Sequence, residues 1–300
     1  MTVRPRTLPF TLLIDPVPAD SPQTAFGGTF HEVDPGAPAL RVGELSAQRG
    51  DGVFETLGVI GGRPQAVGPH LARLGTSAAI CELPEPNTTQ WQAAIAHVVD
   101  RVPDEGEIVL KLVYSRGVES GPAPTAWLHA TAAPDFGPVR EGGIRAVTLD
   151  RGYPHGVADQ APWLLMGAKT LSYAVNMAAL REARRRGADD AIFLTHDDFV
   201  LEGPTSTVML RTGGVYVSPV PSRAILHGTT QQSAFEHLRA AGEHTEYRDV
   251  RVDELRAADA VWLLSSLRMA VSVTELDGRP LPVDLERTRA LNAALLARTT

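Results

Sequence analysis

The sequence contains a single cysteine, Cys81, which excludes an intrachain disulfide framework and any zinc site built from several cysteines; no metal site is expected. No apolar run approaches the roughly 20 residues that a membrane-spanning helix needs, and the apolar stretch 11–14 is too short for a signal peptide. A net charge of −7 argues against nucleic acid or an anionic membrane as the main partner. These absences predict a soluble, cytoplasmic protein.

Lysine is almost as scarce as cysteine. Of the 28 basic residues, only Lys111 and Lys169 are lysines. Arginine holds its proton too tightly to act as a nucleophile, whereas a desolvated lysine can lose its proton and form an imine. The lysines therefore invite a functional explanation, although a preference for arginine in the genome would give the same count. Lys111 lies in a β run, where a structural or exposed position is expected.

A length of 300 residues predicts about two domains, and 43% hydrophobic residues can fill a sizeable core. The Pro/Gly-containing stretch 133–138 is the candidate linker, which predicts a smaller N-terminal α+β domain over 1–138 and a larger one over 139–300. The patterns of the first half predict strands over 53–60, 107–114 and 126–131, a turn at Gly61-Gly62, and helices over 69–83 and 90–102.

The second half alternates short apolar runs with Asp/Gly turns. These runs predict a mixed, mostly antiparallel sheet with helices packed on it, so the fold class is α+β. The predicted strands are 143–149, 191–194, 199–202, 207–210, 215–217 and 260–264, and the predicted helices run from just after Lys169 to Arg186 and from Thr229 to about Gly242.

Four features of the second half fit the requirements of pyridoxal 5′-phosphate. Lys169 follows an apolar and small-residue stretch, 163–168, where burial would lower the pKa of its amine and favour attack on an aldehyde. Glu202 could keep a ring nitrogen protonated, so that the ring accepts electrons. The predicted helix start at 228–230 and the hydroxyls of 265–266 could bind a phosphate. Taken singly, these features also suit a solvated lysine, a turn residue and ordinary helix caps.

The order of several motifs resembles the fold type IV pyridoxal-phosphate enzymes, and the resemblance extends over nearly the whole chain. This family includes branched-chain aminotransferases, D-amino-acid transaminases and 4-amino-4-deoxychorismate lyases, and the match is closest to the lyase-like proteins of actinobacteria. The motifs are 50–56 (GDGVFET), 70–74 (HLARL), 169–173 (KTLSY) with Asn176, 187–191 (GADDA), 202–207 (EGPTST), 225–230 (ILHGTT) and the segment from Ser265-Ser266 to Asp277-Gly278.

The resemblance implies a two-domain fold, with a sandwich-like N-terminal domain and a C-terminal mixed sheet that carries the lysine and the phosphate site. It also implies a homodimer. Lys169 would be the Schiff-base lysine and the proton shuttle, and Glu202 would pair with the pyridinium nitrogen. The phosphate would be bound by Arg73, Thr229, Thr230, Ser266 and Leu267.

Three further residues are candidates for substrate binding. Alternation along 53–60 places Phe54 and Thr56 on one face of a strand, which would line the substrate pocket or belong to a plain core. Arg116 would hold a substrate carboxylate or lie on the surface, and Arg73 without its motif would be a helix-surface arginine. The sequence departs from the family at Thr207 and His227, and the spacing of Tyr173 from Lys169 gives it no assigned role.

The leading hypothesis is a lyase that acts on a small-molecule amine, 4-amino-4-deoxychorismate, and releases pyruvate and p-aminobenzoate, a folate precursor. The alternative is an aminotransferase of D- or branched-chain amino acids, which needs the same lysine, glutamate and phosphate site. A non-catalytic scaffold is the third hypothesis, and the intact lysine argues against it.

Overall fold

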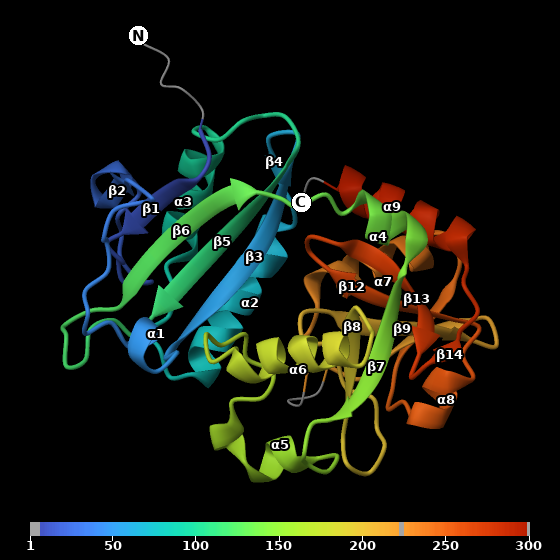
Figure 1. Ribbon diagram of the computed structural model, residues 1–300. Helices are drawn as coiled ribbons and strands as arrows, with labels where there is room; N and C mark the ends of the chain where they lie inside the picture. The colour runs from blue at the N-terminus through green and yellow to red at the C-terminus, as the bar shows by residue number, and fades with distance from the viewer. Residues whose placement is uncertain (1–6, 222–224, 299–300) are drawn as a thin grey trace. The chain divides into compact units, whose positions relative to one another are not determined.

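The first part of the chain folds around a six-stranded sheet in which all neighbouring strands run antiparallel (Figure 1). The computed structural model describes residues 7–221 and 225–298. In sheet order the strands are β2 (Phe30–Val33), β1 (Phe10–Ile14), β6 (Thr125–Ala132), β5 (Glu107–Ser115), β3 (Gly52–Ile60) and β4 (Arg63–Pro64). The strands expected over 53–60, 107–114 and 126–131 are confirmed.

Two helices, α2 (Val67–Ile80) and α3 (Thr88–Val99), cover one face of this sheet (Figure 1). Val53 and Leu57 of β3 are fully buried in the same apolar cluster as Leu74 of α2 and Ile95 of α3. Both helices were predicted from their apolar spacing, and the prediction is confirmed. The first part also contains the short α1 (Leu45–Gln48) and the 3-10 turn η1 (Gly27–Thr29).

The predicted turn at Gly61-Gly62 joins β3 to β4. Both glycines have a positive φ, +55° and +72°, which the tight hairpin turn requires and which glycine adopts without strain. Because β4 pairs only with Val59 and Ile60, it leaves the other end of β3 open to a different partner.

The second part is built on a mixed sheet, as the sequence predicted. The pairs β10–β11, β13–β7 and β7–β8 are parallel, and the others are antiparallel. In sheet order the strands are β11 (His244–Tyr247), β10 (Val215–Ser218), β9 (Thr207–Thr212), β12 (Ala260–Ser265), β13 (Met269–Leu276), β7 (Ile144–Asp150) and β8 (Asp190–Leu194), and β14 (Arg279–Pro280) pairs with β13.

Helices cover both faces of this sheet, which explains the uninterrupted apolar run of β12. Val261 and Leu263 of β12 pack with Leu255 of α8, whereas the indole of Trp262 points the other way and donates to Thr288 of α9 at 2.8 Å. The helices of this part are α4 (Gly137–Gly142), α5 (Val157–Gln160), α6 (Ala174–Arg185), α7 (Thr229–Ala240), α8 (Val252–Arg256) and α9 (Leu285–Ala297), with a 3-10 turn η2 (Pro162–Leu164).

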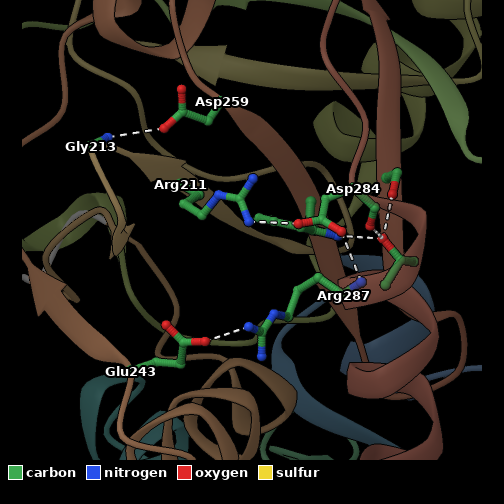
Figure 2. A network of polar contacts seen from close by, with 9 residues as sticks. Arg211, Gly213, Glu243, Asp259, Asp284 and Arg287 are labelled. Carbon is green, nitrogen blue, oxygen red and sulfur yellow. Dashed lines mark hydrogen bonds and ion pairs between the residues drawn. The ribbon is translucent and has the colours of Figure 1, made fainter.

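Helix α9 begins in a polar network that ties it to the sheet (Figure 2). Asp284 caps the helix by accepting from the Arg287 N–H at 2.9 Å, and its other carboxylate oxygen pairs with Arg211 of β9. The side chain of Arg287 in turn pairs with Glu243, just before β11. The sequence prediction included neither α9 nor β13, although the Val/Thr alternation of β13 was a usable signal.

Two predicted boundaries were wrong. The segment 199–202 is not a strand: Phe199 and Val200 form only isolated bridges, while Leu201 and Glu202 bond to Phe193. Helix α6 starts at Ala174 rather than directly after Lys169. The reason is that the backbone after Lys169 is extended and pairs with a strand of the first part.

The contacts divide the described chain into unit 1, with residues up to Pro134 and Ala168–Ser172, and unit 2, with Asp135–Gly167 and Tyr173–Arg298. The sequence placed the lysine in the C-terminal domain, whereas its segment belongs to unit 1. Hydrogen bonds to β3 are the physical cause, because Phe54 N–H donates to Lys169 O and Leu171 N–H donates to Gly52 O. No described helix is long and apolar enough to cross a membrane.

Candidate active site

Lys169 lies on a short extended segment that is bonded to the open end of β3. The segment forms an antiparallel bridge between Thr170 and Val53. Its hydrogen bonds to β3 measure 3.0 Å from Phe54 N to Lys169 O and 2.8 Å from Leu171 N to Gly52 O. The N–H of Lys169 donates to the hydroxyl of Ser77 on α2 at 3.1 Å. The backbone of the lysine is therefore fixed on both sides.

Gly52 permits this close approach. A Cβ at this position would lie 2.8 Å from the side chain of Leu171 and 2.8 Å from the Cα of Ser115 on β5. Any larger residue would push the lysine segment away from β3. The glycine of the motif at 50–56 thus has a structural purpose in holding Lys169.

The amine of Lys169 lies over the ring of Phe54, with 4.6 Å between Nζ and the ring centroid. Phe54 and Thr56 lie on the face of β3 opposite α2, because their neighbours Val53 and Leu57 belong to the core with that helix. Lys111, directly across from Thr56 on β5, also places its Nζ over Phe54, at 4.8 Å. A half-buried lysine on an aromatic ring is a suitable position for an amine that must react.

Arg73 is held by a carboxylate that the sequence analysis did not single out. Its Nε and Nη2 each donate to an oxygen of Glu55 at 2.8 Å, and His70 bonds the same carboxylate at 2.7 Å. Arg73 lies one helical turn before Ser77, so both project from one face of α2. The signal for Glu55 was visible, since it is the one charge in the apolar run VFETLGVI.

Arg116 makes structural bonds in unit 1. Its Nε donates to Asp51 at 2.7 Å, and its Nη1 and Nη2 donate to the carbonyls of Glu82 and Cys81 just after α2. The hydrogen bond to Asp51 raises the pKa of Arg116 above its ordinary value. These bonds close the end of α2, a role that the sequence did not indicate; the binding of a substrate carboxylate stays a prediction.

In unit 2, the half-buried carboxylate of Glu202 contacts the loop that leads into α7. Its Oε2 accepts from the N–H of Leu226 at 3.2 Å, and its carbonyl accepts from Phe193 of β8 at 2.9 Å. Burial raises the pKa of the nearby Tyr153 hydroxyl, and the charge of Glu202 adds to that increase. Glu202 is therefore positioned from both its backbone and its side chain.

The N-terminus of α7 directly follows that loop. Gly228 caps the helix, and a Cβ there would lie only 2.1 Å from Oγ1 of Thr207 on β9. Thr229 and Thr230 are each 2% exposed. The hydroxyl of Thr230 is buried and has no hydrogen-bond partner among the described residues. A helix N-terminus beside an unsatisfied hydroxyl fits an anion such as a phosphate.

Ser266 and Leu267 form the turn between β12 and β13. Their position follows from the sheet, since Leu264 of β12 pairs with Thr207, the residue that Gly228 contacts. The carbonyl of Leu267 accepts from Arg140 of α4 at 2.6 Å. The turn therefore lies two residues beyond a strand position adjacent to the start of α7.

Three residues to which the sequence assigned no role have structural contacts in unit 2. Tyr173 and Asn176 both donate to the carbonyl of Pro204, at 2.6 and 2.7 Å, and so hold the segment that follows Glu202. Thr207 packs against Gly228, and the ring of His227 contacts the Tyr247 hydroxyl at 3.2 Å.

The structure thus brings the predicted residues together in two groups. In unit 1, Lys169 meets Phe54 and is bonded to the helix that carries Arg73. In unit 2, Glu202 is bonded to the loop before Thr229 and Thr230, beside the strand that leads to Ser266.

Comparisons with known proteins agree with this chemistry. A family model described as amino-transferase class IV matches residues 52–276. A bifunctional aminodeoxychorismate lyase/D-amino acid transaminase from Mycobacterium tuberculosis is 47% identical over 263 residues, which cover 83% of this chain and 90% of the relative.

Two solved structures are also similar over most of the chain. A fold IV transaminase from Curtobacterium pusillum has a TM-score of 0.91 and 47% identity, covering 97% of this chain and all (100%) of that one. The pyridoxal-phosphate-bound form of an aminotransferase from Mycobacterium tuberculosis has a TM-score of 0.84 and 44% identity, covering 88% and 96%. The α+β, two-domain fold predicted from the sequence is therefore confirmed.

Proposed function

Because the chain belongs to the class IV aminotransferase family, whose cofactor is pyridoxal 5′-phosphate, we propose that Lys169 holds the aldehyde carbon of this cofactor covalently. Glu202 pairs with the ring nitrogen in this proposal. The residues that bind the phosphate are Arg73, Thr229, Thr230, Ser266 and Leu267.

The buried, unpartnered hydroxyl of Thr230 is the single observation that carries this assignment. Leaving a buried hydroxyl unsatisfied costs about 1–3 kcal/mol, so a bound anion is expected to supply the missing partner. The helix start adds N–H groups that point outward, and the positive end of the α7 dipole favours a phosphate. A glycine cap, which carries no side chain, keeps the approach open.

When bound, the cofactor supplies an electron sink for the charge that develops at the carbon bearing the substrate amine. Glu202 supports this chemistry by keeping the ring nitrogen protonated, since a carboxylate favours a proton on its partner. Lys169 removes the proton from that carbon as a general base. Its backbone, fixed by β3 and Ser77, keeps the amine in one place during the transfer.

The substrate in the leading proposal is 4-amino-4-deoxychorismate, and the products are pyruvate and p-aminobenzoate, a folate precursor. The name of the mycobacterial relative supports this choice, because it includes the lyase activity. Loss of the proton and departure of pyruvate make the ring aromatic, which provides much of the driving force. The protein then needs only to position the substrate and move one proton.

Transamination of D-amino acids is the second candidate, and the same relative's name supports it. Branched-chain amino acids, the other substrates expected from the sequence, are included in this alternative. Both reactions need Lys169 as the base and Glu202 at the ring nitrogen. They differ only in where the proton is returned, so one site can perform both.

We place the substrate against the open face of β3, where Phe54 and Thr56 lie beside the amine of Lys169. Arg116 is the third proposed substrate contact. Its bonds to Asp51 and to the end of α2 support a position at the edge of the pocket rather than at the reacting carbon.

A paired assay tests the proposed function. The loaded enzyme is incubated with 4-amino-4-deoxychorismate without a keto acid, and separately with D-alanine plus 2-oxoglutarate. Equal amounts of pyruvate and p-aminobenzoate in the first tube support the lyase. Amine transfer in the second tube alone supports the transaminase, and no reaction in either tube would reject both.

The proposal also includes a homodimer that acts in the cytoplasm, as the family resemblance and the composition suggested. Sedimentation of the loaded enzyme tests the dimer, and cell fractionation tests the location. A monomer with full activity would reject the first of these two expectations.

A further inference from the structure

A carboxylate, an imidazole and a guanidinium meet inside unit 1, in what we call the buried cluster: Glu55, His70 and Arg73. Glu55 lies on β3 between Phe54 and Thr56, and it points toward α2, which carries the other two residues. The side chains of Glu55 and His70 are 0% exposed, and that of Arg73 is 11% exposed. Arg73 uses Nε and Nη2 on the two oxygens of Glu55, each at 2.8 Å, and His70 Nδ1 is 2.7 Å from one of them.

A carboxylate in such a place needs these partners. Burial would raise the pKa of Glu55, but the charge and hydrogen bonds of Arg73, together with those of His70, outweigh it and hold that pKa well below its usual range. Glu55 is therefore ionised under all ordinary conditions. Its two oxygens form a fixed acceptor pair that determines the plane of the guanidinium.

A second set of the same three residue types provides a comparison in the same unit. In this half-exposed cluster, His97 and Arg101 on and after α3 bond Oε1 of Glu32 on β2, at 2.9 and 3.1 Å. All three side chains are 24–30% exposed. Ion pairs of this kind contribute little to stability, and their geometry is easily changed.

The buried cluster is built into the elements that hold Lys169. Glu55 follows Phe54, the residue whose ring lies under the lysine amine and whose N–H bonds the lysine carbonyl. Arg73 precedes by one turn Ser77, the residue that accepts from the lysine N–H. The guanidinium therefore projects from the same face of α2 as the hydroxyl bonded to Lys169.

We propose that Glu55 and His70 are positioning residues, which fix the guanidinium of Arg73 for the cofactor phosphate; this inference rests on the proposed function of Arg73. They touch neither cofactor nor substrate. Their effect is to remove the rotational freedom of a long side chain before the phosphate arrives.

Charge alone predicts the opposite sign. Glu55 neutralises part of the charge of Arg73, so replacing it with glutamine would leave a more positive site and tighten phosphate binding. Positioning predicts weaker binding, because the glutamine NH2 group would face N–H groups of Arg73 and the two-bond contact would be lost. Glu55→Gln therefore separates the two accounts by direction.

The experiment compares pyridoxal 5′-phosphate with pyridoxal, which lacks the phosphate but can still bind Lys169. Dissociation constants of both are measured by absorbance on the full-length apoprotein of the wild type and of Glu55→Gln. We expect Glu55→Gln to weaken binding of the phosphate form by about 10- to 100-fold, the range for a hydrogen bond to a charged group, and to leave pyridoxal within about twofold. Glu32→Gln, in the half-exposed cluster, is the matched control and should leave both constants unchanged.

Three results would overturn the inference: tighter binding of the phosphate form, no change, or an equal loss for both compounds, which indicates a merely structural role. If Glu55→Gln does not fold, His70→Asn decides by the same ratio, with a smaller loss confined to the phosphate form. Glu55→Asp should recover part of the preference.

Arg73→Ala distinguishes this inference from the proposed function beneath it. If Arg73→Ala keeps the wild-type preference for the phosphate form, the proposed phosphate contact of Arg73 has failed. If Arg73→Ala loses that preference and Glu55→Gln keeps it, only the positioning inference has failed.

Discussion

The chain has two lysines, and both place their Nζ over the ring of Phe54, yet their surroundings differ. Lys111 lies in the middle of β5, between Thr56 of β3 and His129 of β6. In the described part of the chain no carboxylate forms an ion pair with it. Lys169 lies on a segment from a distant part of the sequence, which β3 and Ser77 hold by hydrogen bonds. Nearness to an aromatic ring is thus common to both, and anchoring by a separate segment is particular to Lys169.

The largest expected effect separates the two lysines by activity. Lys169→Ala should reduce turnover by at least about 10²–10⁴-fold, because it removes the proposed general base, and should abolish covalent attachment of the cofactor. Lys111→Met, the matched substitution, should retain turnover within about tenfold and keep the cofactor attached. Steady-state rates and the visible absorbance of the bound cofactor measure both. Equal losses in the two variants would remove the distinction.

Ser77→Ala tests the anchoring of Lys169. The substitution removes the acceptor of the lysine N–H, and the loss should lower the free energy of unfolding by about 1 kcal/mol and slow turnover several-fold. Thr76→Ala, the neighbouring position, loses only an exposed bond to the Ala72 carbonyl and should change neither quantity. Urea unfolding and initial rates provide the measurements. The anchoring account is wrong if the two variants behave alike.

A double-mutant cycle tests the ring that the lysines share. Phe54→Leu and Lys111→Met, singly and together, should show a coupling of about 0.5–1 kcal/mol in the free energy of unfolding, the size of a partly exposed cation–π contact. In the apoprotein, the same cycle with Lys169→Met should give a coupling of similar size, since the two distances are similar. A coupling of zero in both cycles would mean that the ring serves only as packing.

The smallest effect concerns the pH dependence of stability at Lys111. Burial lowers the pKa of Lys111 from its model value of 10.5, so the unfolded chain binds this proton more tightly than the folded chain. Stability from this group is therefore reduced at neutral pH and recovers as the pH rises through the folded pKa toward the unfolded value. Lys111→Met should be slightly more stable than the wild type at pH 7, and the difference should vanish above about pH 10.5. A difference that grows with pH would contradict this sign.

The sequence predicted the local elements of this site well. The strand at 53–60 with its Gly61-Gly62 turn and the helices α2 and α7 follow from periodicity and turn chemistry, which depend on nearby residues. The lysine, the glutamate and the helix start at 228–230 were also found, because a few residue types suit the cofactor.

What could not be predicted depends on contacts between distant residues. The pairing of Thr170 with Val53 makes the lysine segment extended, although the approach to α6 suggested a helix start. The bonds of Glu55 with His70 and Arg73 join a strand to a helix, and no local pattern specifies them. The bonds of Arg116 to Asp51 and to the end of α2 are of the same kind.

The assignment of Lys169 is tested most directly by reduction with borohydride. The loaded enzyme is reduced and digested, and the peptides are mapped by mass spectrometry, which is unambiguous in a chain with two lysines. We expect the phosphopyridoxyl mass on the peptide that contains Lys169 and none on the peptide that contains Lys111. Label on Lys111, or no label on either lysine, would contradict the account.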